Sequence, residues 1–387
     1  MIRTALVIGG GIAGPATAMA LRKAGIDATV YEASTAPRGG AFLTLAPNGV
    51  DALRVLGADG AALASAFPTP GITLRSTTGK ELGTMRTPGV SSFTLRRAAL
   101  DGALRSETVA RDIPVLTGKR LVSFTESAGG VRAKFADGST AEGDVLVGAD
   151  GIHSAVRRVL DPSAPAPAYA GLVGNGGFAP PSAAVSAPPG HYEMIFGRRA
   201  FFGYVVAPGD EVWWFANVPY PAEPARGELA GIDWRSRLLD LFDGDAGPAV
   251  EVIGTTPELV PMDAISSVRG LRSWHSRRVV LVGDAAHAPT PTSGQGASLS
   301  IEDGLVLAKC LRDYPDPADA FARYEASRRP RVERIVKAAA RNNSSKAAGP
   351  VGRVIRDAVM PAVLKLASTS NAQRQVFEYH VDWAAAA

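Results

Sequence analysis

Four residues near the start of the chain have the types and spacing of a dinucleotide-binding turn. Gly9, Gly11 and Gly14 fit the pattern Gly-x-Gly-x-x-Gly, and Glu32 follows at roughly the 20-residue spacing at which a carboxylate accepts hydrogen bonds from an adenosine ribose. The first glycine allows a tight turn, the second lets the backbone approach a pyrophosphate, and the third lets a helix pack closely on a strand. Plain close packing is the alternative explanation, and the pattern does not say which dinucleotide binds.

The residues around this turn predict the elements that position it. Residues 5–8 are typical of a short buried strand, and Pro15 suits the first turn of a helix that ends at Gly25. Residues 26–31 then predict a second strand, which ends at Glu32. The glycines and the proline interrupt the apolar stretch, which argues against a secretion signal or a membrane-spanning helix.

Composition indicates an ordinary globular enzyme. The 387 residues, 46% of them hydrophobic, suffice for two domains with separate cores. The net charge of +4 is small and Lys and Arg are scattered, so we expect no nucleic-acid partner. The single cysteine, Cys310, cannot form an intrachain disulfide, which suits a reducing compartment. We therefore predict a cytoplasmic protein with no membrane partner.

The histidines do not predict a metal site. The chain has five of them, and no two have the spacing of metal ligands. We expect neither a structural nor a catalytic metal.

A second glycine turn follows a predicted buried strand late in the chain. Residues 279–282 form that strand, Gly283 and Asp284 the turn, and residues 289–296 a loop before a helix that begins near Ala297. Glu302 and Asp303 are expected in the early turns of this helix, where its dipole favours acids. A long cofactor that meets the protein at both ends would explain two such turns.

Aromatic residues mark a different region between the two turns. Residues 191–196, 201–206 and 212–218 are short runs separated by Gly, Pro and Asp, which is typical of antiparallel strands. This pattern predicts a second domain inserted in the first.

Three motifs together resemble a known family. They are the first turn with Glu32, the run Gly148-Ala-Asp-Gly-Ile-His-Ser-Ala-Val-Arg157, and Gly283-Asp284 followed by Pro291 and Gly294-Gln-Gly296. Their order is similar to that of single-component FAD-dependent monooxygenases of the p-hydroxybenzoate hydroxylase type, which include salicylate hydroxylase-like and tetracycline-inactivating enzymes.

The resemblance implies an α/β fold: a Rossmann-like FAD-binding domain, an inserted, mostly antiparallel β-sheet substrate domain, and a C-terminal helical tail. The expected FAD-binding domain is discontinuous, with residues 1–70, 96–165 and 275–340. Residues 71–95 and 166–274 would form the substrate domain, and residues 341–387 the helical tail.

The resemblance also implies roles for single residues. Glu32 would hold the adenosine ribose, Arg97 the pyrophosphate-ribityl region and Asp284 the ribityl chain, while the Val122 backbone touches the adenine. Pro291 would lie beside the flavin ring, and a helix N-terminus at residues 296–298 would stabilise negative charge on the reduced ring. The expected cofactor contacts are Gly9, Gly11, Ile12, Ala13, Gly14, Glu32, Arg97, Val122, Asp150, Asp284, Pro291, Gly294, Gly296, Ala297 and Ser298.

For two residues of the run 148–157, two interpretations remain open. Asp150 and Arg157 either contact FAD or nicotinamide directly or form an ion pair that fixes a strand-helix corner. His287 is expected to be a structural histidine rather than a base.

The implied activity is oxygen insertion. NAD(P)H would reduce FAD, and a flavin C4a-hydroperoxide would hydroxylate an aromatic or polycyclic small molecule, with epoxidation or Baeyer-Villiger oxidation as variants. No catalytic side chain or metal is required, and NADPH and NADH are not distinguished. Natural-product tailoring and antibiotic inactivation are the expected settings. The alternatives are an FAD oxidoreductase or halogenase that inserts no oxygen, and a non-catalytic flavin- or ligand-binding protein.

The substrate site is expected between the flavin and the aromatic strands. Alternation puts His191 and Glu193 on one face and Tyr192 and Met194 on the other, without saying which faces the cavity. Asn175-Gly176 stands where the family often has Trp-Arg, which predicts a wider pocket or a shifted loop. The candidate substrate contacts are Asn175, His191, Phe202 and Trp214.

Overall fold

A parallel sheet forms the centre of one half of the protein. The computed structural model describes residues 2–36, 39–86, 92–344, 350–368 and 371–387. The five strands are parallel, in the order β18-β12-β1-β2-β8. Their bounds are β1 (Thr4–Ile8), β2 (Asp27–Tyr31), β8 (Val115–Leu116), β12 (Val145–Gly148) and β18 (Val279–Leu281). The strands predicted at residues 5–8, 26–31 and 279–282 are therefore present within about one residue at each end.

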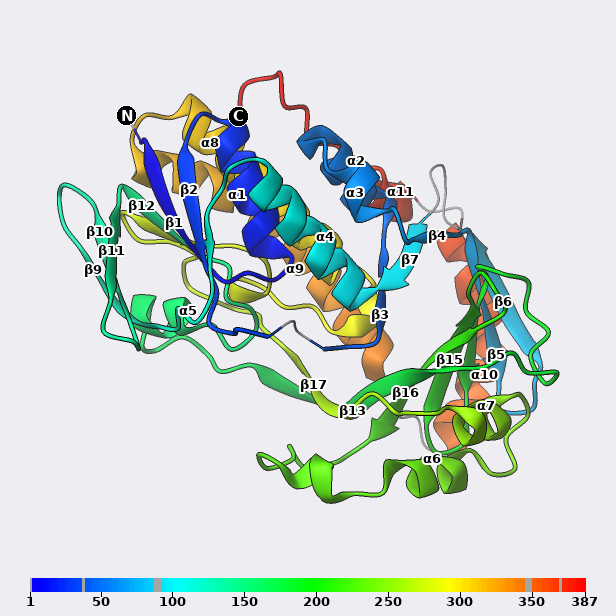
Figure 1. Ribbon diagram of the computed structural model, residues 1–387. Coiled ribbons are helices and arrows are strands. Elements are labelled where there is room, and N and C mark those ends of the chain that lie inside the picture. Colours follow the sequence, from blue (N-terminus) through cyan, green and yellow to red (C-terminus); the bar gives the residue numbers. More distant parts are fainter. Residues whose placement is uncertain (1, 37–38, 87–91, 345–349, 369–370) are drawn as a thin grey trace.

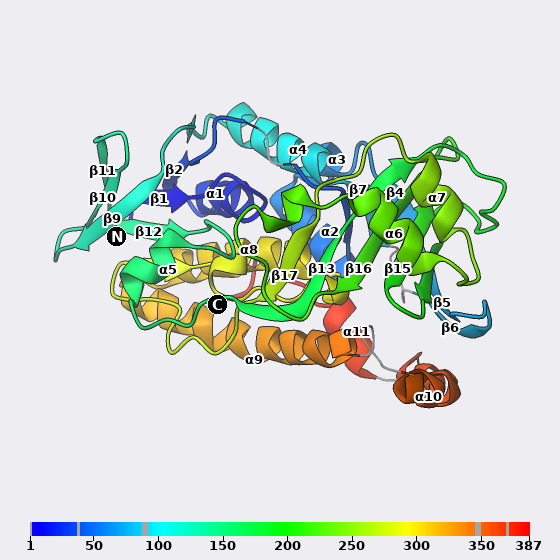
Figure 2. The ribbon, with the colours of Figure 1, turned by 90° about the horizontal axis from the view of Figure 1, so that it is seen from below.

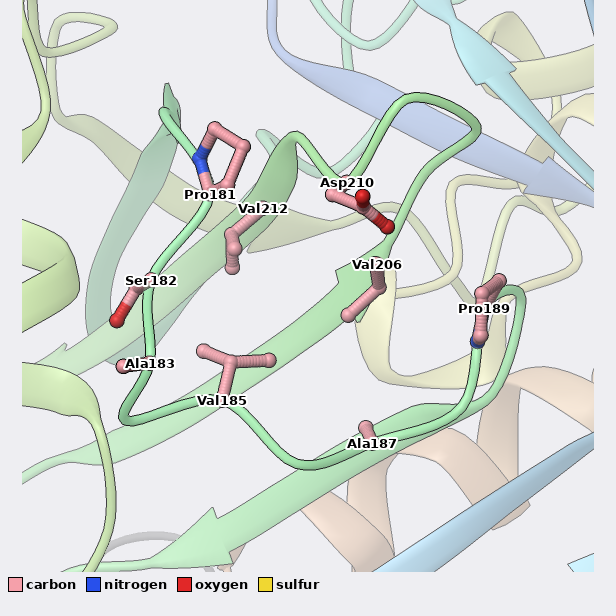
Figure 3. Close-up of a pocket in the computed structure, with 9 residues that line it drawn as sticks. All are labelled: Pro181, Ser182, Ala183, Val185, Ala187, Pro189, Val206, Asp210 and Val212. Carbon is pink, nitrogen blue, oxygen red and sulfur yellow. The ribbon is translucent and has the colours of Figure 1, made fainter.

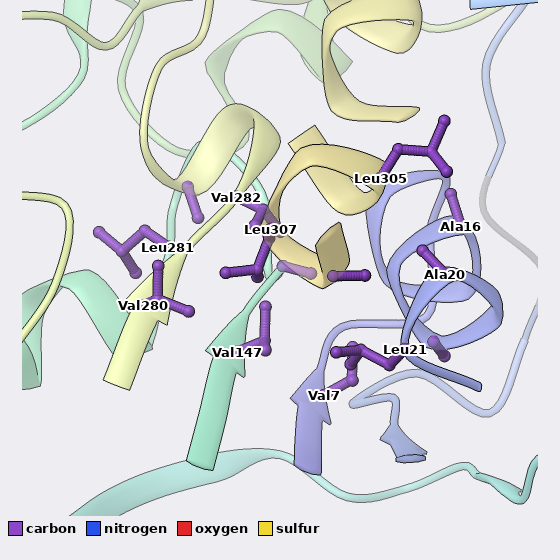
Figure 4. Packing of buried hydrophobic residues seen from close by; sticks show 14 of the residues in the cluster. Val7, Ala16, Ala20, Leu21, Val147, Val280, Leu281, Val282, Leu305 and Leu307 are labelled. Atoms are coloured by element: carbon purple, nitrogen blue, oxygen red, sulfur yellow. The ribbon is translucent and has the colours of Figure 1, made fainter. Parts of the chain in front are cut away.

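Two helices cover one face of this sheet and supply its core. They are α1 (Ala13–Lys23) and α8 (Gly296–Asp313). Figure 4 shows Leu21 and Leu307 from these helices packed with Val7 and Val147 of the strands, all of them fully buried. A Cβ at Gly304 would lie 2.9 Å from the Cα of Thr17, so the close approach of α1 and α8 requires glycine there.

A seven-stranded sheet forms the second half (Figure 1). Its order is β17-β13-β16-β15-β14-β5-β6, antiparallel except for the β14–β5 pair. The strands are β5 (Gly71–Ser76), β6 (Glu81–Arg86), β13 (Ala168–Ala179), β14 (Tyr192–Phe196), β15 (Phe201–Val206), β16 (Val212–Pro219) and β17 (Asp263–Ser267). The predicted antiparallel strands of the inserted region, and with them the α/β fold class, are confirmed.

Short elements connect the two halves. A three-stranded sheet has the order β3-β7-β4, from β3 (Phe42–Leu45), β4 (Phe67–Thr69) and β7 (Ser92–Arg96). Strand β7 therefore spans the domain boundary predicted between residues 95 and 96, and the predicted domain limits stay a prediction. Helices α2 (Pro47–Leu56) and α4 (Arg97–Ala110) flank these strands, and α3 (Asp59–Ala62) packs on both helices. Helix α5 (Ala155–Leu160) lies elsewhere, beside β18 of the parallel sheet. A further three-stranded sheet consists of β9 (Leu121–Glu126), β10 (Val131–Phe135) and β11 (Thr140–Gly143).

The remaining helices lie outside the sheets. Helices α6 (Trp234–Phe242) and α7 (Ala249–Thr255) cover one face of the seven-stranded sheet. The C-terminal part contains α9 (Pro317–Ser344), α10 (Pro350–Ser368) and α11 (Asn371–Phe377), and Figure 2 shows α9 running alongside α8. Among the described residues, no helix has the length and apolar character needed to cross a membrane.

Candidate FAD and substrate site

The turn between β1 and α1 has no room for side chains at two glycines. Gly9 has φ of +113°, and a Cβ there would lie 2.3 Å from the carbonyl oxygen of Ala149. A Cβ at Gly14 would lie 1.8 Å from the carbonyl oxygen of Gly9. Gly11 and Ile12 lie within this turn and Ala13 begins the helix, so backbone N–H groups of the first helical turn are available to an anion. The turn therefore has the cradle that a pyrophosphate needs.

Glu32 is buried behind the same turn. Its carboxylate accepts hydrogen bonds from the backbone N–H groups of Gly10 (2.6 Å) and Ser34 (2.7 Å). A Cβ at Gly10 would lie 2.8 Å from the Cβ of Glu32, so this glycine is required as well, although the Gly-x-Gly-x-x-Gly pattern treats it as variable. Glu32 thus fixes the turn in addition to its proposed contact with a ribose.

The start of β9 also lies close to Glu32. The backbone N–H of Lys119 donates to the carbonyl oxygen of Glu32 at 2.8 Å, two residues before β9 begins. Val122 is the second residue of that strand, and its side chain is exposed. The adenine contact of the Val122 backbone stays a proposal.

The second predicted turn brings together three residues that are far apart in the sequence. Asp284 follows β18, and its Oδ1 lies 3.9 Å from where a Cβ of Gly296 would stand. Burial raises the pKa of the Asp284 carboxyl, and the nearby charges of His287 and Arg97 offset this only in part. Gly40 packs against Arg97, since a Cβ there would lie 3.0 Å from the Cδ of Arg97. Arg97, Asp284 and Gly296 therefore border one site.

The N-terminus of α8 faces this site with unused donors. The first intrahelical bond is from the N–H of Leu299 to the carbonyl oxygen of Gln295, which leaves the N–H groups of residues 296–298 outside the helical ladder. Pro291 and Gly294, the latter with φ of +60°, shape the loop that leads into the helix. The hydroxyl of Ser298 accepts from the N–H of Ala46 at 3.1 Å, so its side chain ties α8 to the start of α2.

The central motif connects the two turns in a way the sequence did not predict. The Asp150 carboxylate caps α5, accepting from the N–H groups of Ala155 (2.6 Å) and Val156 (3.1 Å), and burial raises its pKa. Arg157 donates to the carbonyl oxygens of Ala285 (2.9 Å) and Ile152 (2.5 Å). These contacts do not include the Asp150–Arg157 ion pair, which was one of the two interpretations of the motif. Asp150 caps α5, and Arg157 binds the turn that carries Asp284. A direct contact of Asp150 with FAD stays a proposal.

Glu302 and Asp303 have partners that the sequence analysis, which placed them in the early turns of this helix and invoked only its dipole, did not predict. They lie about two turns into α8, fully buried, among cationic side chains from α9. Arg328 Nη2 lies 2.6 Å from Glu302 Oε2, and Arg328 Nε lies 2.7 Å from Asp303 Oδ1. Burial raises the pKa of the Asp303 carboxyl, but His287 and Arg328 lower it more, so it lies below the usual range.

His287 belongs to the same buried cluster. Its Nε2 lies 2.6 Å from Asp303 Oδ2, and its ring packs on Trp274 with 5.1 Å between centroids. Asp303 Oδ2 also accepts from the N–H of Gly283 at 2.9 Å. The role of His287 as a structural residue therefore has direct support in its contacts.

One amide connects this charge cluster to the loop before α8. Asn48 Nδ2 donates to both Gln295 Oε1 (2.9 Å) and Glu302 Oε1 (2.6 Å). Arg331 also binds Glu302, at 2.9 Å from Oε1. Sequence analysis missed Asn48, Gln295 and the two arginines. An arginine pair on one helix, placed after an adjacent acid pair on another, is the signal that could have indicated them.

Two candidate substrate residues lie on the face of the seven-stranded sheet that is turned away from the site. Phe202 and Trp214 are fully buried and stack with 5.7 Å between centroids, and Phe202 packs on Phe242 of α6. Trp214 Nε1 donates to Thr256 at 2.8 Å. Both residues belong to the core under α6 and α7, so we no longer propose them as substrate contacts.

The opposite face carries a cluster of aromatic side chains beside β3, some of them partly exposed and others, Tyr192 and Trp213, buried. Phe42 packs against Trp213 (5.5 Å between centroids), Phe178 (6.3 Å) and Phe215 (6.3 Å). Tyr192 and Met194 belong to the same cluster, which answers the question of which face of β14 points to the FAD side. We call Phe42, Phe178, Tyr192, Met194, Trp213 and Phe215 the aromatic face.

The other two candidates do not join this face. His191 Nε2 lies 2.8 Å from the hydroxyl of Thr73, on the side of the sheet where Glu193 pairs with Arg75. Asn175 pairs with Ala216 in the sheet, but its side chain lies outside the described part of the structure. The predicted widening of the pocket at Asn175 therefore stays a prediction.

A pocket of about 340 Å³ lies elsewhere on this sheet (Figure 3). The segment from Pro181 to Pro189 curves over Val206 and Val212, and Asp210 is its one charged lining residue. Val185 and Ala187 pack with the core of Phe202 and Trp214, so the pocket opens on the side away from the aromatic face. Among the described residues, no group of three or more His, Cys, Asp or Glu side chains could hold a metal ion.

The sequence model of a family described as FAD binding domain matches residues 3–339. The chain belongs to this family. The aurachin C monooxygenase/isomerase of Stigmatella aurantiaca is 33% identical over 341 residues, 86% of this chain and 87% of the relative. The FAD-dependent urate hydroxylase of Klebsiella oxytoca is 32% identical over 346 residues, with the same coverage. The crystal structure of Klebsiella pneumoniae HpxO complexed with FAD and uric acid has a TM-score of 0.82 and 29% identity, over 97% of this chain and 95% of that one.

The site fits the cofactor of this family, the FAD-dependent enzymes of the p-hydroxybenzoate hydroxylase type. The glycine cradle, the buried Glu32 and the paired position of Arg97 and Asp284 match the two ends of a long dinucleotide. The predicted family and the prediction of FAD are confirmed by the family match and the FAD-bound neighbour.

Proposed function

We propose that this protein uses NAD(P)H and O2 to insert one oxygen atom into an aromatic small molecule bound between FAD and the aromatic face. The observation that carries the proposal is the position of that face. Phe42 in β3 lies just after Gly40, which packs on Arg97 beside Asp284, so stacked rings adjoin the proposed flavin site. Relatives described as a monooxygenase and a urate hydroxylase support the reaction class.

The cofactor contacts divide between the two turns. In this proposal the N–H groups at the start of α1 bind the pyrophosphate, and Glu32 accepts from the adenosine ribose. Asp284 and Arg97 bind the ribityl region, while the N–H groups of residues 296–298 stabilise negative charge on the reduced ring. Bound FAD supplies the redox chemistry, since it accepts a hydride from NAD(P)H and activates O2.

The protein's own side chains position the substrate and exclude water from it. The partly exposed rings of Phe42, Phe178 and Phe215 offer faces and edges on which an aromatic substrate stacks, each such pair contributing roughly 0.5–1.5 kcal/mol beyond area burial. Apolar walls exclude water from the reacting centre and hold the substrate ring in place. We assign no side chain as a catalytic acid or base.

Isotope labelling tests the reaction. Purified holoprotein is supplied with NADPH or NADH, aromatic candidates and O2 enriched in the heavy isotope. The proposal expects FAD to copurify, reductant oxidation to rise with substrate, and one labelled oxygen atom in the product. Substrate-dependent reduction without label in the product would indicate an FAD oxidoreductase or halogenase instead. Bound FAD with no turnover on either reductant would indicate a binding protein.

A further inference from the structure

One carboxylate oxygen at the edge of the aromatic face serves two donors. Glu211 Oε2 accepts from Arg96 Nη2 at 2.8 Å and from Trp213 Nε1 at 2.5 Å. Glu211 lies in the turn between β15 and β16, whereas Arg96 ends β7. The contact therefore joins the three-stranded sheet to the seven-stranded sheet beside the aromatic face.

The cation in this pair lies directly on the rings of the aromatic face. The guanidinium carbon of Arg96 is 3.8 Å from the ring centroid of Phe178 and 5.1 Å from that of Trp213. The next residue in the chain, Arg97, borders the proposed ribityl site. Arg96 is thus the cation that a substrate on this face would meet.

Every polar group found at this face already has a partner. Tyr192 Oη lies within hydrogen-bond distance of the hydroxyls of Thr44 (3.0 Å) and Thr94 (3.3 Å), and the indole N–H of Trp213 is taken by Glu211. The charge of Arg96 is balanced by Glu211 at the same point. Among the described residues of this face, therefore, no cation without a carboxylate partner is available to bind an anionic substituent of a substrate.

We propose that Glu211 is a specificity-determining residue that makes the enzyme select uncharged aromatic substrates over their carboxylated analogues. A substrate carboxylate at Arg96 would have to displace Glu211 or lie beside it, and two like charges within a few ångströms repel each other. This inference rests on the proposed function, because it takes the aromatic face as the substrate site.

The size of the effect follows from the exposure of the pair. The side chains of Arg96 and Glu211 are 45% and 38% exposed, so solvent screens their fields. Repulsion between the Glu211 carboxylate and a substrate carboxylate within a few ångströms, reduced by that screening, corresponds to about tenfold weaker binding of the carboxylated substrate.

The test compares two ligands that share one ring system, naphthol and hydroxynaphthoate, on the purified holoenzyme without reductant. Binding is read from quenching of tryptophan fluorescence, to which Trp213 contributes. In the wild type, naphthol should bind at least about tenfold more tightly than hydroxynaphthoate. Glu211→Gln keeps an oxygen acceptor for Trp213 and Arg96 but removes the charge. It should reduce the ratio of the hydroxynaphthoate to the naphthol dissociation constant about tenfold, chiefly by tighter hydroxynaphthoate binding.

Two further variants sharpen the comparison. Arg96→Gln leaves Glu211 unbalanced and should increase the preference for naphthol, opposite in direction to Glu211→Gln. Glu142→Gln breaks an exposed ion pair with Arg132 on the sheet of β9 to β11 and should leave the ratio unchanged.

Three results would overturn the inference. The first is equal affinity for both ligands in the wild type and in Glu211→Gln. The second is a wild type that prefers hydroxynaphthoate, with Arg96→Gln removing that preference, which would make Arg96 an anchor for anions. The third is no binding of either ligand. Failure of the proposed function is seen separately, since it appears as missing FAD or unlabelled product while the ligand ratio is measured without turnover.

Discussion

Arg328 and Asp303 form an ion pair with no solvent exposure on either side chain, 2.7 Å from Nε to Oδ1, although they lie on different helices. Asp303 also holds the N–H of Gly283, the residue before Asp284. The pair therefore connects α9 to the turn that carries the proposed ribityl contact. Removing one partner of such a pair lowers the free energy of unfolding strongly, because the other charge then remains buried without that partner.

Arg328→Met should destabilise the protein by about 3–5 kcal/mol, since Glu302 and Asp303 each lose a buried cation and keep only Arg331 and His287, respectively, beside them. Urea unfolding followed by circular dichroism measures the change. Arg132→Met, which breaks an exposed pair with Glu142, is the matched control and should cost no more than about 1 kcal/mol. Equal effects of the two substitutions would contradict the assigned role of Arg328.

Acid should remove the stabilisation that Asp303 provides. The pKa of its carboxyl is lower in the folded protein than the roughly 3.9 of an unfolded chain, so its contribution is complete above about pH 4–5 and declines as the pH falls toward the folded value. Asp303→Asn has no proton to take up. The difference in unfolding free energy between wild type and Asp303→Asn should therefore narrow between pH 5 and pH 2, with the pH dependence expected for the titration of about one group. A constant difference across that range would argue against a lowered pKa.

Asp284→Ala should weaken FAD binding. Loss of a charged hydrogen-bonding partner costs about 1.5–3 kcal/mol, or roughly ten- to 150-fold in affinity. Titration of the apoprotein with FAD, followed by flavin fluorescence, gives the ratio of dissociation constants. Asp240→Ala, at an exposed carboxylate paired with Arg199, serves as the control. Undiminished flavin content of Asp284→Ala after gel filtration would show that the carboxylate has another role.

Glu32→Ala should lose FAD affinity by a similar factor and also lose stability, because the N–H groups of Gly10 and Ser34 lose their buried acceptor. Glu32→Gln keeps one oxygen and should retain more of both properties. Since the flavin ring is bound elsewhere, saturating FAD should restore most of the Glu32→Ala rate. An enzyme that keeps its FAD but has no activity would place this carboxylate in the chemistry instead.

Gly14→Ala should disrupt the first turn. The new Cβ would overlap the carbonyl oxygen of Gly9, and backbone cannot yield as a flexible side chain can. Thermal unfolding and FAD content should both fall sharply. Gly102→Ala, in α4 where an added Cβ meets nothing within 4 Å, should instead stabilise by roughly 0.5–1 kcal/mol. Loss of FAD from both variants would point to a general effect of alanine rather than to the cradle.

The features that sequence analysis predicted well are those that depend on neighbours along the chain. Gly9, Gly14 and the strand before them are local, and Asp284 and Gly296 lie within one strand, loop and helix. The family resemblance added Arg97, which no local pattern connects to Asp284.

Features that depend on distant partners were predicted less well. Alternation along β15 and β16 separates Trp213 from Trp214, but only α6, later in the chain, shows which of them belongs to the core. The roles of Glu302 and Asp303 similarly depend on Arg328 and Arg331 of α9. From the sequence alone, the helix dipole was the one available explanation for the positions of Glu302 and Asp303, because their partners lie on another helix.

The C-terminal segment touches both halves of the molecule although the family match ends at residue 339. Leu364 of α10 is buried against Leu82 and Phe196 of the seven-stranded sheet, whereas Trp383 packs under Arg312 of α8. The contacts that join the two halves thus extend beyond the part of the chain that the family model matches. A substitution at Leu364 or at Trp383 would therefore loosen one end of this segment without altering a residue at the proposed flavin site.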